Sequence, residues 1–137
     1  IVHWPAGLKS KAGRITRAVG HVFDIMPTCL DLAGAKPLTQ IKGNKTYPMN
    51  GKSLTPLFND KMRTPHSVLY WDHAQGAAIR KDGWKLVRVG RKKGKWELYQ
   101  IVEDRVELKN LANKHPDKVE ALAAEWNAWR VRTRAME

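Results

Sequence analysis

The chain is poor in acidic residues and in cysteine. Its 137 residues hold 25 lysines and arginines but only 13 aspartates and glutamates, which gives a formal net charge of +12. This surplus favours anionic partners and salt-sensitive binding, although a basic surface also keeps a protein soluble by repulsion. The single cysteine excludes an internal disulfide and any zinc site built from several cysteines.

Further absences exclude other classes of protein. The sequence contains no run of 18 apolar residues, so no transmembrane helix is expected. It also lacks a glycine-rich phosphate loop, a nucleophile elbow and the H-E-x-x-H metal motif. By contrast, 42% of the residues are hydrophobic and six are tryptophan. This composition is typical of a globular protein with its own core.

The strongest local signal is a turn in the middle of the chain. Asp82-Gly83 separates two runs of strand-forming residues and predicts an antiparallel hairpin over residues 77–89. The β-branched and aromatic residues of 67–71 predict a strand before this hairpin, and we expect another over 96–102. The simplest arrangement is a sheet of four antiparallel strands.

Two segments have the spacing of amphipathic helices. The first begins after Thr16, a potential cap, and its apolar stripe comprises Val19, Val22, Phe23, Met26, Leu30 and Ala33. Pro27 lies inside it and predicts a kink, or two short helices that meet near Met26. The second begins at Pro116, and its apolar face comprises Val119, Leu122, Ala123, Trp126 and Trp129. We expect this terminal helix to dock on the sheet.

The other segments predict shorter elements. Residues 1–4 predict a short strand that ends at Pro5, and residues 35–52 predict a loop. Residues 53–58 have room for one or two helical turns. Together these predictions describe an α+β fold, in which a small four-stranded antiparallel sheet is packed by a C-terminal helix.

Five segments, in this order along the chain, resemble the C-terminal subdomain of the sulfatases, the arylsulfatase-like sulfuric ester hydrolases. The segments are Ile1 to Gly7, Val19 to Gly34, Asn50 to Leu57, Ala78 to Val87 and Glu97 to Ala112. The chain departs from the family pattern at Asn50, where aspartate is usual, and at Arg105, where proline is usual. Both are substitutions in loops.

The resemblance implies a division of the chain at residue 64. Residues 1–64 would be the end of the catalytic-domain region, with a strand end, a kinked helix and a long loop that pack on the missing catalytic α/β domain. Residues 65–137 would form the C-terminal antiparallel-sheet subdomain with its terminal helix. The N-terminal catalytic domain is therefore the expected partner, and a membrane is not.

The resemblance also implies a parent enzyme that hydrolyses sulfate esters with a formylglycine nucleophile and a calcium-type metal. Cys29 lacks the arginine of the C-x-P-S-R or C-x-A-x-R motif, and no matching metal cluster or sulfate-binding lysine motif occurs in the chain. We therefore expect a C-terminal piece of a sulfatase that is inactive alone and carries no cofactor. The parent would act on a sulfated small molecule or glycan; its compartment is left open, and the periplasm and the extracellular space are both compatible with the resemblance.

Two groups of residues are candidate sites. Trp71 and His73 end a predicted strand, and the resemblance implies that they rim the substrate pocket. There His73 would donate to a sulfate or sugar hydroxyl and Trp71 would stack on the sugar ring. The alternative is an ordinary surface histidine beside a core tryptophan. The second group is a basic turn that could bind polyanions, or be a solvated loop that discourages edge pairing; it comprises Arg88, Arg91, Lys92, Lys93 and Lys95.

One residue pair and one other function complete the hypotheses. His21 and Asp24, three residues apart, are compatible with an acid–base or metal pair, although a structural hydrogen bond is the more ordinary role. The charge of +12 with interleaved aromatic residues also fits a basic binding module for a sulfated glycan or, as the less expected ligand, nucleic acid.

Overall fold

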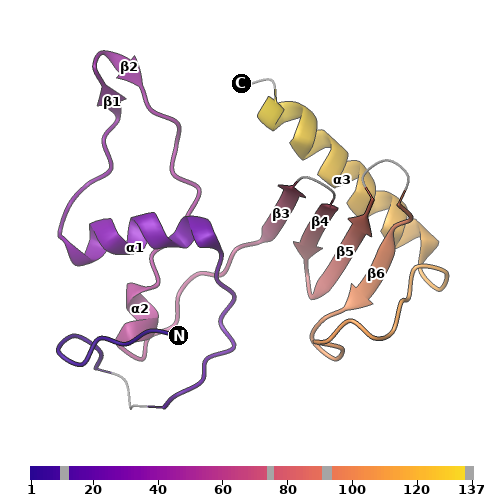
Figure 1. The fold of residues 1–137 in the computed structure, drawn as a ribbon, viewed down its shortest axis with the longest axis horizontal. Helices are drawn as coiled ribbons and strands as arrows, with labels where there is room; N and C mark the ends of the chain where they lie inside the picture. Colours follow the sequence, from indigo (N-terminus) through magenta and orange to yellow (C-terminus); the bar gives the residue numbers. More distant parts are fainter. Residues whose placement is uncertain (10–12, 74–75, 91–93, 135–137) are drawn as a thin grey trace. The chain divides into compact units, whose positions relative to one another are not determined.

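The computed structural model describes residues 1–9, 13–73, 76–90 and 94–134. The chain divides into two units, Ile1–His66 and Ser67–Glu137, called unit 1 and unit 2 below. Unit 2 contains a four-stranded sheet and a long helix, whereas unit 1 consists of short helices, loops and a small hairpin (Figure 1). Within the described residues, no helix is long and apolar enough to cross a membrane.

The sheet of unit 2 is a simple antiparallel meander. Its strands are β3 (Val68–His73), β4 (Gly76–Lys81), β5 (Trp84–Val89) and β6 (Glu97–Gln100), in the order β3-β4-β5-β6. The turn between β4 and β5 has positive φ at both Asp82 (49°) and Gly83 (78°). A two-residue turn of this kind matches the right-handed twist of its strands, and Asp-Gly tolerates both angles. The predicted four-stranded antiparallel sheet is confirmed.

The terminal helix α3 (Pro116–Arg134) covers one face of this sheet. Trp126 is 1% exposed and packs with Leu122 against Ile79, Leu86 and Leu98, each with no exposed surface. The indole Nε1 of Trp126 donates to the backbone oxygen of Trp71 at 2.9 Å, so its one polar atom is satisfied. The predicted terminal helix, its apolar face and the α+β fold class are confirmed.

Unit 1 is built from shorter pieces. It contains a 3₁₀ turn η1 (Val22–Asp24), the helices α1 (Ile25–Leu32) and α2 (Thr55–Phe58), and the hairpin of β1 (Gln40–Ile41) and β2 (Asn44–Lys45). The two helical segments η1 and α1 meet next to Met26, as Pro27 predicts. Pro27 is tolerated because it lies in the first turn of α1, where backbone N–H groups have no partner inside the helix.

Three local predictions for unit 1 are wrong. Residues 1–4 form no strand, because the described residues supply no strand that pairs with them; instead the N–H groups of Gly7 and Leu8 close a turn on the oxygen of Trp4. Thr16 caps no helix, since its hydroxyl accepts from Ala18 and the helical segment begins later, at Val22, after a cap at His21. The predicted loop 35–52 contains the β1–β2 hairpin.

We predict that Trp126→Ala destabilises unit 2 by about 3–5 kcal/mol, because it opens a large cavity between α3 and the sheet. The free energy of unfolding in urea, followed by far-UV circular dichroism, measures this loss. Val131→Ala on the same helix is the control, since Val131 is 71% exposed and its truncation should change stability by about 0.5 kcal/mol at most. Equal losses for the two variants would contradict the packing of Trp126.

Candidate functional site

A carboxylate occupies the centre of unit 1. Asp24 has no exposed surface, and it and Thr28 are the buried residues among those described in this unit. The Oδ1 atom of Asp24 accepts from the backbone N–H of Lys52 and contacts Nε2 of His66, both at 2.8 Å. Its Oδ2 atom accepts from the backbone N–H of His21 at 2.9 Å and from Arg63 Nη2 at 3.0 Å. Each carboxylate oxygen therefore has two partners.

Arg63 and Thr28 extend this cluster to the neighbouring backbone. The guanidinium of Arg63 also donates to the oxygens of Val19 at 2.7 Å and Lys52 at 2.9 Å. The hydroxyl of Thr28 donates to the backbone oxygen of Asp24 at 2.6 Å and accepts from the backbone N–H of Leu54 at 2.9 Å. The start of α1, the segment around Lys52 and the end of unit 1 are thereby joined through one carboxylate.

The electrostatics of the cluster favour the ionised carboxylate. Burial alone would raise the pKa of Asp24, but the backbone donors of Lys52 and His21, followed by His66 and Arg63, outweigh it and lower the pKa to about 2. Burial also lowers the pKa of His21, against the attraction of Asp24. His21 and Asp24 form a capping box at the start of η1, in which the backbone N–H of His21 donates to Asp24, so the geometry matches the structural hydrogen bond and not an acid–base pair.

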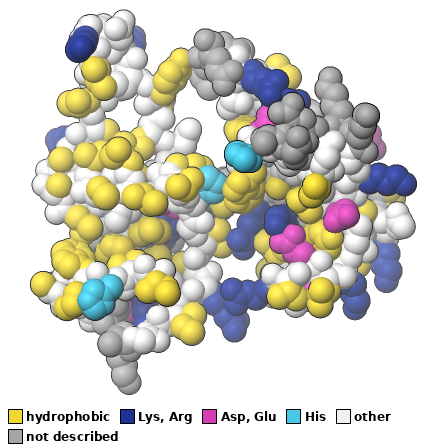
Figure 2. Space-filling model, viewed as in Figure 1, with side chains coloured by type: hydrophobic (Ala, Val, Ile, Leu, Met, Phe, Trp, Pro, Cys, Tyr) yellow, Lys and Arg dark blue, Asp and Glu magenta, His cyan; other side chains and the backbone are white. Residues whose placement is uncertain are grey.

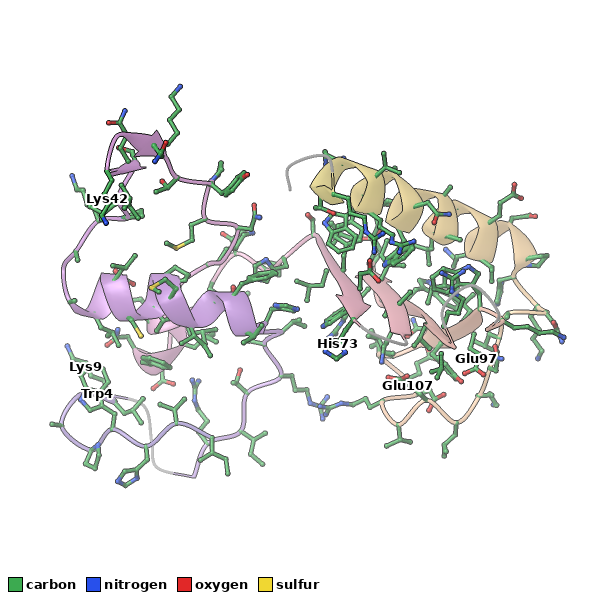
Figure 3. All side chains as sticks on the ribbon, turned by 45° about the horizontal axis from the view of Figure 1, so that its top comes forward. Trp4, Lys9, Lys42, His73, Glu97 and Glu107 are labelled. Carbon is green, nitrogen blue, oxygen red and sulfur yellow. The ribbon has the colours of Figure 1, made fainter. Side chains whose placement is uncertain are left out.

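Trp71 and His73 lie on one face of β3, because alternate residues of a strand point to the same side. Tyr70 and Asp72 point to the opposite side of the strand, toward α3. Tyr70 stacks on Trp129 with ring centroids 4.8 Å apart, and Asp72 pairs with Arg130 at 2.9 Å. His73 is exposed, on the side of the sheet away from α3 (Figure 3). The strand therefore brings the two rim candidates together, and their role in substrate binding stays a prediction.

The residues of the basic turn have different surroundings. Arg88 lies in β5 with its guanidinium carbon 4.4 Å from the ring centroid of Trp96 and 5.6 Å from that of Trp126. Lys95 is exposed. Arg91, Lys92 and Lys93 lie outside the described residues. Arg88 is thus stacked between the sheet and α3, and a polyanion patch at this turn stays a prediction.

The residues present do not fit the formylglycine or the calcium that the sulfatase resemblance implies. Cys29 is exposed on α1, and leucine, aspartate, leucine and alanine follow it instead of the motif's arginine. Across the described ranges, no three His, Cys, Asp or Glu side chains lie together in a group that could hold a metal ion. Neither group is therefore assigned to residues of this chain.

Unit 1 also has an open apolar surface. A cavity of about 700 Å³ lies between its first residues and α2, with Trp4, Leu8, Leu54, Leu57 and Phe58 among its lining. On the helical segments, Val22 is 71%, Ile25 57% and Met26 60% exposed. The predicted apolar stripe of the first helix is therefore exposed on several of its residues. Within the described part of unit 1 no apolar side chain is buried.

Residues 1–130 match the family model of the C-terminal region of N-sulphoglucosamine sulphohydrolase. The chain belongs to this sulfatase C-terminal family. It is 32% identical over 117 residues to an uncharacterized sulfatase of Schizosaccharomyces pombe, and 26% identical over 126 residues to an N-acetylglucosamine-6-O-sulfatase of Bacteroides thetaiotaomicron. These alignments cover 82% and 83% of the chain but 21% of each relative. The chain thus spans about a fifth of the length of these sulfatases.

Solved structures share the fold of the sulfatase C-terminal chain. The protein Ps i-CgsB superposes with a TM-score of 0.65 at 24% identity, over 93% of this chain and 27% of its own. A protein solved with its substrate D-glucosamine-2-N,6-O-disulfate superposes with a TM-score of 0.57 at 19% identity, over 82% of this chain and 24% of its own. At identities this low, the structural likeness shows a common fold and carries no statement about function.

We predict that the contribution of Asp24 to stability depends on pH. Because its folded-state pKa of about 2 lies below the ordinary value near 4, the contribution is complete above about pH 4 and is lost as the pH falls toward 2. The difference in free energy of unfolding between the native chain and Asp24→Asn should therefore shrink by about 2 kcal/mol over this range.

Urea unfolding read from the NMR signals of the Lys52 and Leu54 amides, which both donate into the cluster, reports on unit 1. The exposed Asp117→Asn in unit 2 is the matched control, and it should leave these signals unchanged. A stability difference for Asp24→Asn that stays constant from pH 5 to pH 2 would show that the carboxylate is not held in its ionised form.

Proposed function

We propose that this chain works as the C-terminal part of a longer sulfatase, to which it contributes a scaffold rather than catalytic groups. Two observations support the proposal: the family match over residues 1–130, and the fact that the chain spans about a fifth of the length of its sulfatase relatives. The nucleophile and the metal of the reaction would then lie on other parts of the polypeptide. The chain alone would hydrolyse no sulfate ester.

The observation that carries the scaffold role is the exposed apolar surface of unit 1. Val22, Ile25 and Met26 are each more than half exposed, and a large cavity lies beside α2. Exposed apolar patches of this kind mark interaction surfaces. Covering each of these side chains would contribute roughly 1.5–3 kcal/mol. We propose that the catalytic domain of the same protein provides this cover.

The proposed substrate class is a sulfated sugar. One relative is an N-acetylglucosamine-6-O-sulfatase, and one structural neighbour was solved with a sulfated glucosamine. The reaction would add water across the sulfate ester, which breaks its S–O bond and releases inorganic sulfate and the sugar hydroxyl. In this chain, His73 and Trp71 are proposed to contact the sugar at the rim of the pocket, His73 as a hydrogen-bond donor and Trp71 as a stacking surface.

We predict that the longer protein hydrolyses a sulfated glucosamine with release of sulfate and that the purified chain does not, with or without added calcium. In the longer protein, His73→Ala should raise KM and lower kcat/KM about threefold or more, because one hydrogen bond to the sulfate or to a sugar hydroxyl is lost. Sulfate release, measured by ion chromatography, tests the activity of the two proteins and the effect of His73→Ala. Lys114→Ala, an exposed residue of unit 2, is the control.

Turnover by the chain alone would contradict the scaffold role. Unchanged kinetics of His73→Ala would remove this histidine from the substrate rim without affecting the rest of the proposal.

A charged side chain on the apolar face of α1 tests the docking surface. We predict that Met26→Glu leaves the melting temperature of the chain alone nearly unchanged, because Met26 is already 60% in water. In the longer protein the same change should lower the melting temperature by several degrees, since it places a charge in a buried interface. Val131→Glu, at a position on α3 that is 71% exposed, is the matched control. Equal effects of Met26→Glu in both proteins would contradict docking through α1.

A further inference from the structure

The β1–β2 hairpin of unit 1 carries positive charge without a compensating acid. Lys36, Lys42 and Lys45 lie on or beside it, and no aspartate or glutamate occurs between Asp31 and Asp60. All three lysines are exposed, and the ion pairs of the described residues involve other side chains. Figure 2 shows Lys and Arg side chains at this end of unit 1. Their ammonium groups are therefore available to an anionic ligand.

The hairpin is an ordered structure that projects from the helices of unit 1 (Figure 1). Gln40 pairs with Lys45 and Ile41 with Asn44 across the two strands. Below these pairs, Thr46 closes the base of the hairpin: its N–H donates to the oxygen of Thr39 at 3.0 Å, and its hydroxyl donates to the oxygen of Leu38 at 2.6 Å. These bonds place Lys42 and Lys45 on one small hairpin.

The turn of this hairpin contains an unusual residue. Lys42 and Gly43 have φ of 48° and 83°, the combination that Asp82 and Gly83 adopt in unit 2. Asparagine, aspartate and glycine suit the first of these positions, whereas a lysine there is strained. Residues in strained conformations cluster at functional sites. The strained position places the charge of Lys42 at the tip of the hairpin.

We propose that the hairpin of residues 36–47 binds a sulfated polysaccharide through the ammonium groups of Lys36, Lys42 and Lys45. The ligand class rests on the proposed function, because a sulfatase that acts on sulfated sugars meets polymers of this kind. Sites for single-stranded nucleic acid stack successive bases on several aromatic rings, whereas residues 36–47 contain one aromatic side chain, Tyr47. The side-chain amides of Gln40 and Asn44 add donors for sulfate and hydroxyl oxygens.

Binding of the purified chain to heparin across a sodium chloride gradient tests the hairpin. The variant with Lys36→Gln, Lys42→Gln and Lys45→Gln should bind heparin at least tenfold more weakly at 0.15 M salt, because about three charge contacts are lost. The slope of log K against log salt should fall by about 2–3. The matched control replaces Lys61, Lys109 and Lys114, which are exposed and lie outside the hairpin, by glutamine.

Lys42→Asn separates binding from turn geometry. Asparagine suits the positive φ, so this variant should have a higher melting temperature than the native chain while it binds heparin more weakly. A lower melting temperature together with unchanged heparin binding would contradict a role of Lys42 in binding.

Three outcomes overturn the inference. Equal losses for the hairpin variant and the control would show that net charge alone governs retention. Equal binding to desulfated heparin would exclude sulfate as the recognised group. Tighter, hairpin-dependent binding of single-stranded DNA would assign the hairpin to nucleic acid. Sulfate release by the longer protein from a small substrate is measured separately, so its absence contradicts the proposed function, whereas hairpin-independent heparin binding contradicts only this inference.

Discussion

Unit 1 depends on the buried carboxylate of Asp24. Its four partners come from three segments, and the farthest of them, His66, is 42 residues away in the sequence. Removing one partner of a buried ion pair typically costs 3–5 kcal/mol, because the other charge is left without compensation. The carboxylate fixes the positions of three segments through hydrogen bonds and buries no apolar surface. It can therefore hold these segments together while the apolar side chains of unit 1 stay in water.

The two units are stabilised in different ways. Unit 2 contains a core in which Trp126 and Leu122 of α3 pack on the strands, whereas unit 1 has a polar centre and exposed apolar residues on α1. A unit of the second kind gains stability when another polypeptide covers it. The proposal that unit 1 docks on the catalytic domain of a longer protein rests on this difference between the units.

The basic surplus of the chain is unevenly available to ligands. Arg88 is stacked on Trp96, Arg130 is paired with Asp72, and Arg63 is buried with Asp24. The lysines of the β1–β2 hairpin have no such partners among the described residues. A net charge of +12 therefore says less about binding than the places where the charges lie. Those places favour the hairpin over Arg88 as a contact for anionic polymers.

Much of unit 2 could be predicted from the sequence because its signals are local. Asp82-Gly83 determines the turn, the strand-forming runs on either side determine the sheet, and Pro116 with its spaced apolar residues determines α3. The family resemblance was likewise present in short segments of adjacent residues. The sequence placed the rim candidates Trp71 and His73 at the end of a strand, and the structure extends this strand to His73, so that both lie on one face.

Only the tertiary structure decided how the cluster in unit 1 forms. His21 and Asp24 could be singled out by spacing, but nothing in the sequence assigns Arg63 and His66 to the same carboxylate. A contact between residues some 40 positions apart depends on the path of the intervening loops, which local propensity does not describe. The stacking of Arg88 on Trp96 and the exposure of the apolar stripe on α1 were undecided for the same reason: both depend on what packs beside them.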